Sequence, residues 1–243
     1  MTTFNDNTLA SLLREEFTLR LVEPNIFSVL ADDETGNEYD SQFGLLYDLI
    51  ACHPIYNRLI WGYSVNIFKK IIHDALQSSS EGYLLDLGCG SLAFTAQAYA
   101  QGNNRPVVLA DRSLKMLRMA KSRLLKLRGN IPENIVFLHA DALNLPFQEN
   151  TFTTIISENL LHCLHETMPL LNQLESIIAK NGKLYFTTLV KTDRWADRYL
   201  QVLADSNKLV SRTANDHKEI FTKAGFNATY QTTGNLLSII CEK

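Results

Sequence analysis

From residue 83 onward, short apolar segments alternate with stretches of helical periodicity, and this alternation restricts the fold more than any other feature. The predicted strands are Tyr83–Leu87, Pro106–Ala110, Asn134–His139, Phe152–Ser157 and Lys183–Leu189. Strands that alternate with helices in this way indicate a parallel sheet covered by helices on both faces. Ligands of such sheets bind beyond the carboxyl ends of the strands, so the residues that follow each strand are the functional candidates.

The first 80 residues differ from the rest in pattern and in charge. They hold five basic and eleven acidic residues, whereas the remaining chain holds 18 basic and 15 acidic ones. Apolar side chains at helical spacing over residues 9–21, and two further stretches over 41–52 and 55–77, predict a helical region. We therefore expect an N-terminal helical lid or substrate region over residues 1–80 and a ligand-binding domain over 81–243.

Composition restricts the class of protein. Hydrophobic residues make up 46% of the 243-residue chain, and the formal net charge of −3 gives no overall attraction to nucleic acid or to anionic membranes, although a local patch could still provide one. No apolar run reaches the roughly 18 residues of a membrane span, and the start of the chain lacks the pattern of a secretory signal. Cys52, Cys89, Cys163 and Cys241 are widely spaced, so we expect no metal site and no disulfide framework. Reduced thiols in the cytoplasm are the simplest interpretation.

The turn after the first predicted strand carries the strongest functional signal. Gly88 and Gly90 lie between a strand and a helix, where missing side chains let a ligand approach the backbone. The spacing Gly-x-Gly-x-x-Ala also fits a dinucleotide fingerprint, and Asp111 ends the next strand, where a carboxylate can bind ribose hydroxyls. An NAD(P)- or flavin-dependent oxidoreductase is therefore one interpretation. Asp86 argues against it, because a carboxylate beside this turn repels a pyrophosphate and favours a cationic ligand.

These strand ends are similar to known motifs. From about Gly82 to the C-terminus the chain resembles the class I S-adenosylmethionine (SAM)-dependent methyltransferases. The similar segments are LDLGCG at 85–90, VLAD at 108–111, the helix start at 111–124, HADALNLPF at 139–147, the strand and helix start at 152–164, and AGF at 224–226. The resemblance implies an α/β fold with a doubly wound, Rossmann-like sheet of seven strands, mostly parallel with an antiparallel last strand.

The resemblance also implies a cofactor and the residues that hold it. SAM would be the methyl donor and S-adenosylhomocysteine the product. Asp86 and the glycine turn would hold the methionyl end, and Asp111 the ribose. Asp141 and Ala142 would meet the adenine. The implied cofactor-binding residues are Asp86, Gly88, Cys89, Gly90, Asp111, Arg112, Met116, Asp141, Ala142, Leu143, Ser157 and Glu158.

Two features keep alternatives open. Leu92 stands where the family usually has a third glycine, and a leucine there would narrow the space beside the methionyl group or point into the sheet. A non-catalytic SAM-binding protein is therefore one alternative.

The basic run over residues 112–128 raises RNA methylation as another alternative. No aromatic residues interleave these charges, and the fourth strand lacks the Asn/Asp-Pro-Pro-Tyr/Phe signature of enzymes that methylate nucleic-acid amino groups, so a solvated helix face is the favoured interpretation.

The acceptor side is defined more loosely. His162 follows the fourth strand and is the one candidate general base, because the ordinary pKa of histidine lies near neutrality; packing at the helix start is the alternative. The segment 53–63 resembles the lid of small-molecule methyltransferases of the ubiquinone/menaquinone biosynthesis type. The implied acceptor-pocket residues are Tyr47, Tyr56, Trp61 and Tyr63. We therefore expect methyl transfer from SAM to a small organic molecule by direct displacement. The acceptor, the atom that is methylated and the oligomeric state, a homodimer included, are left open.

Overall fold

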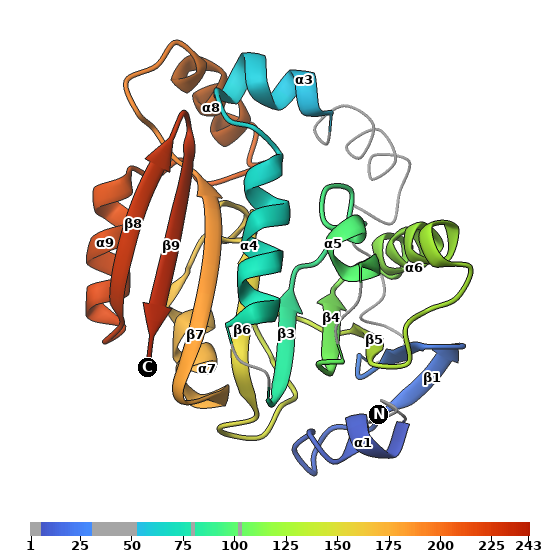
Figure 1. Ribbon diagram of the computed structural model, residues 1–243. Helices are drawn as coiled ribbons and strands as arrows, with labels where there is room; N and C mark the ends of the chain where they lie inside the picture. The colour runs from blue at the N-terminus through green and yellow to red at the C-terminus, as the bar shows by residue number, and fades with distance from the viewer. Residues whose placement is uncertain (1–5, 31–52, 79–80, 102–103) are drawn as a thin grey trace.

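The computed structural model describes residues 6–30, 53–78, 81–101 and 104–243. Among them, nine strands form one sheet with helices on both faces (Figure 1). The strands are β1 (Arg20–Glu23), β2 (Ile26–Ser28), β3 (Tyr83–Leu87), β4 (Val107–Asp111), β5 (Ile135–His139), β6 (Phe152–Glu158), β7 (Ile178–Leu189), β8 (Asn227–Thr233) and β9 (Leu236–Glu242). The helices are α1 (Asp6–Ala10), α3 (Pro54–Tyr56), η3 (Asn57–Trp61), α4 (Asn66–Gln77), α5 (Ala96–Ala100), α6 (Leu114–Arg128), η4 (Leu161–Cys163), α7 (Met168–Ile177), α8 (Ala196–Asp205) and α9 (Ala214–Lys223).

The strand order is β1-β2-β5-β4-β3-β6-β7-β9-β8. β3 pairs in parallel with β4 on one side and with β6 on the other, so the order reverses at β3. β9 lies antiparallel to both β7 and β8. The predicted α/β fold with a mostly parallel sheet is confirmed, and the switch point lies at the strand that carries the glycine turn.

The prediction of seven strands is wrong, because the N-terminal segment adds two more. β1 and β2 form a hairpin across Pro24 and Asn25, and β2 pairs in parallel with β5. Asn25 has φ 66°, a left-handed conformation that asparagine tolerates in tight turns. The helix expected over residues 9–21 is also wrong beyond Ala10. Leu9, Leu12 and Leu13 pack into the core next to the sheet and not along a continuous helix, with Leu13 bridging to Phe147, whereas Leu21 on β1 is exposed.

The central strands of the sheet are buried on both faces. Leu85 and Leu87 belong to the core cluster under α7 and α9, whereas Leu84 belongs to the cluster under α4, α5 and α6. This alternation follows from the two-residue period of a strand, and it explains why the strands were recognisable as continuous apolar runs. Asp86 points to the same face as Leu84, towards α5.

The helices before residue 78 pack on the sheet and on α8. The predicted helical stretch over residues 55–77 is interrupted at Gly62, whose φ of 75° is left-handed. α4 buries Phe68, Ile72 and Ala75, the last two against the sheet. The stretch over 41–52 lies outside the described residues, so the lid and the division at residue 80 stay predictions. No described helix has the length and apolar character required to cross a membrane.

Candidate active site

The turn after β3 presents bare backbone at the switch point of the sheet. The N–H groups of Gly88 and Cys89 donate to the Ala110 carbonyl at 2.8 and 3.0 Å, which ties the turn to β4. Gly88 and Gly90 have φ of 72° and 55°. A Cβ built on Gly90 would meet no atom within 4 Å, so this side of the turn faces open space that a ligand can approach.

Leu92, the departure from the family pattern, shares the left-handed backbone with φ 55°. Its side chain is 2% exposed and belongs to the core cluster under α4, α5 and α6. The leucine therefore keeps the turn geometry of a glycine and points into the core, which is one of the two arrangements considered from the sequence.

Two buried carboxyl groups lie at the ends of β3 and β6. The Tyr99 hydroxyl donates to Asp86 Oδ2 at 2.7 Å. Burial raises the pKa of Asp86 to about 7; the bond from Tyr99 partly offsets this rise, and the Asp111 carboxylate adds to it. Burial also raises the pKa of Glu158 well above its usual range, and the charge of Asp86 adds to that rise. Neither carboxyl group forms an ion pair with a residue that the structure describes. A cationic ligand would therefore stabilise the ionised form of both groups.

Three consecutive polar side chains at the end of β6 have buried atoms without a partner in the described part of the chain. They are Ser157 Oγ, Glu158 Oε1 and Asn159 Oδ1. Buried polar atoms in folded proteins are normally hydrogen-bonded, so such a group indicates a ligand or solvent site. Ser157 and Glu158 were predicted to line the site, and Asn159 was not.

Asp111 connects the glycine turn to the start of α6. Its Oδ2 accepts from the Gly90 N–H and its Oδ1 from the Ser113 N–H, both at 2.8 Å. Ser113 in turn caps α6 by accepting from the Met116 N–H at 3.2 Å. The predicted residues at the ends of β3 and β4 are therefore held in one network, although the Met116 side chain itself is buried, at 5% exposure.

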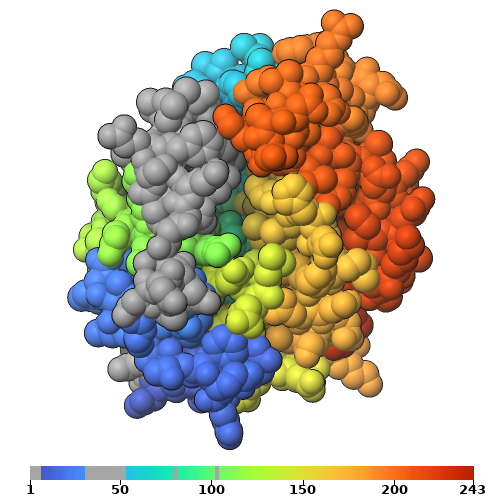
Figure 2. Space-filling view, turned by 180° about the vertical axis from the view of Figure 1, so that it is seen from behind, coloured from blue at the N-terminus to red at the C-terminus, as the bar shows by residue number. Residues whose placement is uncertain are grey.

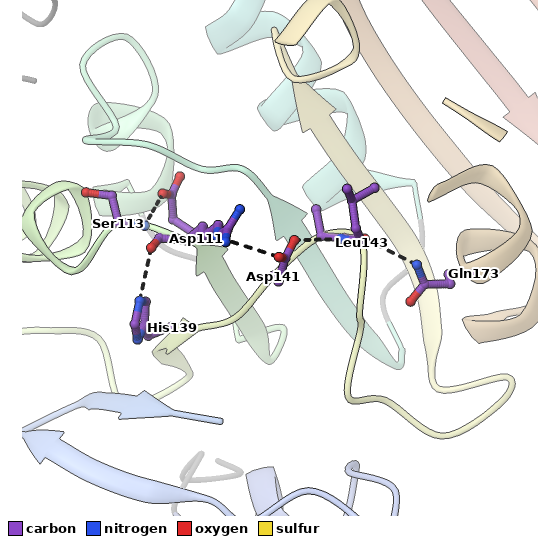
Figure 3. Close-up of polar contacts among 8 residues, drawn as sticks. Asp111, Ser113, His139, Asp141, Leu143 and Gln173 are labelled. Atoms are coloured by element: carbon purple, nitrogen blue, oxygen red, sulfur yellow. Dashed lines mark hydrogen bonds and ion pairs between the residues drawn. The ribbon is translucent and has the colours of Figure 1, made fainter. Parts of the chain in front are cut away.

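A second polar network holds the loop after β5 (Figure 3). Asp141 pairs with Arg112 at 3.5 Å and accepts from the Leu143 N–H at 2.9 Å. His139 contacts the Arg112 carbonyl at 3.0 Å, and Gln173 donates to the Ala142 carbonyl at 3.5 Å. Leu143 itself is half exposed, at 47%. These contacts bring Arg112, Asp141, Ala142 and Leu143 together beside Asp111.

His162 lies in η4, after β6, and is 5% exposed. Its Nδ1 accepts from the Leu189 N–H at 3.2 Å and lies 3.2 Å from Thr188 Oγ1. Burial lowers the pKa of His162 to about 4, with further contributions from His217 and Arg212. The ring is therefore neutral at pH 7 and uses one nitrogen to hold the end of β7.

The predicted acceptor residues lie mainly in a third core cluster, which joins η3 and α4 to α8. Trp61 and Tyr63 are each 4% exposed. Trp61 stacks on Tyr199 of α8 with ring centroids 5.5 Å apart, and Tyr56 is half-buried beside them. Tyr63 donates to Asn57 at 2.6 Å. Tyr47 lies outside the described residues.

Comparison with known proteins assigns the family. A family model described as a methyltransferase domain matches residues 78–235. The chain belongs to this methyltransferase family. Similar curated proteins include the ubiquinone/menaquinone biosynthesis C-methyltransferases of Vibrio cholerae, 22% identical over 87% of this chain and 96% of the relative, and of Cellvibrio japonicus, 25% identical over 79% and 80%. The demethylmenaquinone methyltransferase of Lactococcus lactis is 28% identical over 62% of this chain and 68% of the relative.

Solved structures share the fold of this methyltransferase. A SAM-dependent methyltransferase from Aquifex aeolicus matches with a TM-score of 0.59 and 16% identity over 81% of this chain and 97% of that one. Phosphoethanolamine N-methyltransferase 2 of Haemonchus contortus in complex with SAM matches with a TM-score of 0.60 and 15% identity over 73% and 52%. The predicted class, a SAM-dependent methyltransferase, is confirmed.

The methyltransferase site fits SAM on its own chemistry. SAM carries a sulfonium and an ammonium and has no phosphate, which suits the buried Asp86 and Glu158 carboxyl groups. The bare backbone at Gly90 and the unpartnered oxygens at the end of β6 offer space and hydrogen-bond acceptors. The same carboxyl groups oppose the pyrophosphate that a dinucleotide would bring.

Several residues of this methyltransferase site were missed from the sequence. Tyr99, which orients Asp86, lies 13 positions further on in α5, and no motif marks it. Gln173 comes from α7 and reaches the loop after β5 through space. Ser113 could have been found, because a serine directly before a helical run is a typical N-cap.

The basic run on α6 is largely engaged within the methyltransferase itself. Arg118 donates to Glu23 at 2.7 Å, Lys121 lies 3.7 Å from the same carboxylate, and Arg123 donates to the Ser91 carbonyl at 2.6 Å. These contacts give the run a structural use, which is to attach α6 to the β1–β2 hairpin and to the glycine turn.

Proposed function

We propose that this methyltransferase transfers the methyl group of SAM to a ring carbon of a small, apolar aromatic acceptor of the quinol type. The observation that carries the SAM part is the pair of buried carboxyl groups, Asp86 and Glu158, beside a bare glycine turn at the switch point of the sheet. The acceptor class is supported by the relatives named for ubiquinone and menaquinone, which match along most of the chain.

We assign the cofactor-binding roles as follows. Asp86, oriented by Tyr99, and Glu158 balance the positive charge of the methionyl end, and the backbone of the Gly88–Gly90 turn lies against it. Asp111 binds the ribose: the Gly90 and Ser113 N–H groups fix its carboxylate at the end of β4, beside the glycine turn, and carboxylate oxygens accept hydrogen bonds from hydroxyls.

The adenine end is assigned to the loop after β5. Asp141 is held in place by the Leu143 N–H and by Arg112, so its carboxylate keeps a fixed direction. Ala142 is fixed through its carbonyl by Gln173. Cys89 and Met116 border the site; burial raises the pKa of the Cys89 thiol, so it packs as a neutral group and not as a nucleophile.

When bound, SAM supplies an electrophilic methyl group on a sulfonium. The protein then has to align the acceptor carbon with that methyl group and exclude water. Ser157, Glu158 and Asn159 at the end of β6 form the floor at which the two would meet. His162 remains the proposed base, but it is a weak one: its pKa is about 4, and the one lone pair of the neutral ring, on Nδ1, already accepts from the Leu189 N–H, so orientation carries most of the catalysis.

Two measurements test this function. Calorimetric titration with SAM and with NADH separates the two cofactor classes, and tight NADH binding without SAM binding would overturn the assignment. Incubation with methyl-labelled SAM and a demethylated quinol then tests the acceptor. We expect label on a ring carbon of the quinol. Label on oxygen, or no transfer to quinols in the presence of measurable SAM binding, would refute the acceptor class and leave the cofactor assignment intact.

A further inference from the structure

A cluster of exposed apolar side chains covers one end of the molecule. The side chains are Ile55 at 62% exposure, Leu59 at 67%, Trp195 at 60%, Tyr199 at 39% and Val202 at 61%, and we call this set the α3–α8 surface. Ile55 and Leu59 are four positions apart in the α3–η3 helix. Trp195, Tyr199 and Val202 have the spacing i, i+4, i+7 along α8. Each set therefore lies on one face of its helix, away from the face that is buried.

The two helices are fixed to one another, so their exposed faces form one surface. Trp61 stacks on Tyr199, and Tyr56 packs edge-on against Trp61 with ring centroids 6.4 Å apart. The guanidinium of Arg194 lies over Gly62, so close that a Cβ there would be 2.6 Å from Nη2. Figures 1 and 2 show the α3 segment and α8 side by side at one end of the molecule. In Figure 1 this is the end towards which β3 and β6 run, where the active site lies.

The charge around this surface is opposite in sign to that of the whole chain. Over residues 53–62 and 193–208, the exposed charged side chains are Arg58, Arg194, Arg198 and Lys208 against Asp193 and Asp205. No ion pair joins Arg58, Arg194 or Arg198 to any residue that the structure describes. Asp197 of α8 is turned inward, where it accepts from the Thr192 and Asp193 N–H groups and from Asn235. The surface is thus locally cationic on a chain of formal charge −3.

We propose that the α3–α8 surface docks the enzyme on an anionic lipid bilayer. Amphipathic helices that combine Trp, Tyr and aliphatic residues with arginine lie in the bilayer interface, with the apolar groups in the acyl boundary and the guanidinium groups at the headgroups. Attraction of Arg58, Arg194 and Arg198 to anionic lipids would add to the insertion of the apolar side chains and hold this end of the molecule towards the lipid. The inference rests on the proposed function in one respect: an apolar acceptor dissolved in the bilayer would then reach the active site from the docked end.

Vesicle flotation of the full chain tests the docking. We expect binding to phosphatidylcholine vesicles that contain about one third phosphatidylglycerol, weaker binding to phosphatidylcholine alone, and release by high salt. The double variant Leu59→Glu/Val202→Glu places two charges on the surface at positions that are more than half exposed, so folding is little affected. It should reduce vesicle binding at least tenfold. The matched control is Leu127→Glu, an exposed leucine of α6 at 53% exposure, which should bind as the wild type does.

The proposal is overturned if the wild type does not float with anionic vesicles, or if the double variant and the control lose binding equally. Self-association of the wild type through this surface, detected by ultracentrifugation, disrupted by the double variant and accompanied by no vesicle binding, would assign the surface to a protein partner instead. SAM titration of each variant is read separately: loss of vesicle binding with unchanged SAM affinity supports docking, whereas absent SAM binding in the wild type would refute the proposed function alone.

Discussion

Leu92 provides a direct test of the glycine turn, because burial and backbone strain act on it in opposite directions. Its side chain is 2% exposed and its φ is 55°. Truncating a buried leucine to alanine costs about 2–5 kcal/mol of stability. The left-handed conformation costs a residue with a Cβ roughly 1–2 kcal/mol. Leu92→Ala should therefore lose the packing and keep the strain, whereas Leu92→Gly should lose the packing and be relieved of the strain.

The order of the two variants is the informative result. At a right-handed position, glycine is about 0.5–1 kcal/mol less favourable than alanine. At Leu92 the glycine variant no longer has the strain of the left-handed backbone, and this gain offsets the intrinsic disadvantage of glycine. The glycine variant should therefore be as stable as the alanine variant or more stable, by up to about 1 kcal/mol. Urea unfolding followed by circular dichroism measures the difference. A glycine variant less stable than the alanine variant by 0.5 kcal/mol or more, the ordinary order, would refute the left-handed assignment.

Leu92 also tests which way its side chain points. Because the side chain lies in the core and the open side of the turn is at Gly90, we expect Leu92→Gly to change SAM affinity by less than about tenfold. Calorimetric titration with SAM measures this, with the stability of the variant as its control. A large gain in affinity would mean that the leucine intrudes on the methionyl group.

The carboxyl groups and His162 yield four further predictions. Asp86→Asn should weaken SAM binding by about 10–100-fold and Tyr99→Phe by less, since charged hydrogen bonds contribute about 1.5–3 kcal/mol; equal affinity in both variants and the wild type would contradict the assigned role. Because the raised pKa of Asp86, about 7, keeps it largely protonated in acid, SAM affinity should rise from pH 6 to pH 8 and level off above, and Asp86→Asn should flatten this profile. Asp111→Ala should lower SAM affinity at least tenfold through the lost ribose contact, and unchanged affinity would mean that the ribose lies elsewhere. His162 binds fewer protons in the folded than in the unfolded state between pH 4 and 6.5, so stability should rise with pH in that window; His162→Gln should remove this contribution, and an activity loss above about 100-fold with a folded variant would support the base role.

The strands that carry the active site could be predicted from the sequence because they are buried on both faces. β3 has the predicted bounds Tyr83–Leu87, and β6 differs from its prediction by one residue. Such strands are largely apolar, and the functional residues lie at or directly after their ends: Gly88 follows β3, Asp111 ends β4 and Glu158 ends β6. The N-terminal hairpin had no such signal, since β1 is largely exposed and the apolar spacing before it is helical. Its place in the sheet depends on β5, about 110 residues further along the chain.

The sequence by itself determined the α/β class, the position of the glycine turn and the identity of the acids that end the strands, because these depend on local period and on residues next to one another. Tertiary structure alone decided which groups those acids contact. The Tyr99 hydroxyl orients Asp86, and the charge of Asp86 helps to raise the pKa of Glu158, although the three side chains come from α5 and from two strands. The same holds for the α3–α8 surface, whose two halves lie about 140 residues apart in the chain and meet through Trp61 and Tyr199. A pKa or a surface depends on distances in space, and a linear pattern carries no information about them.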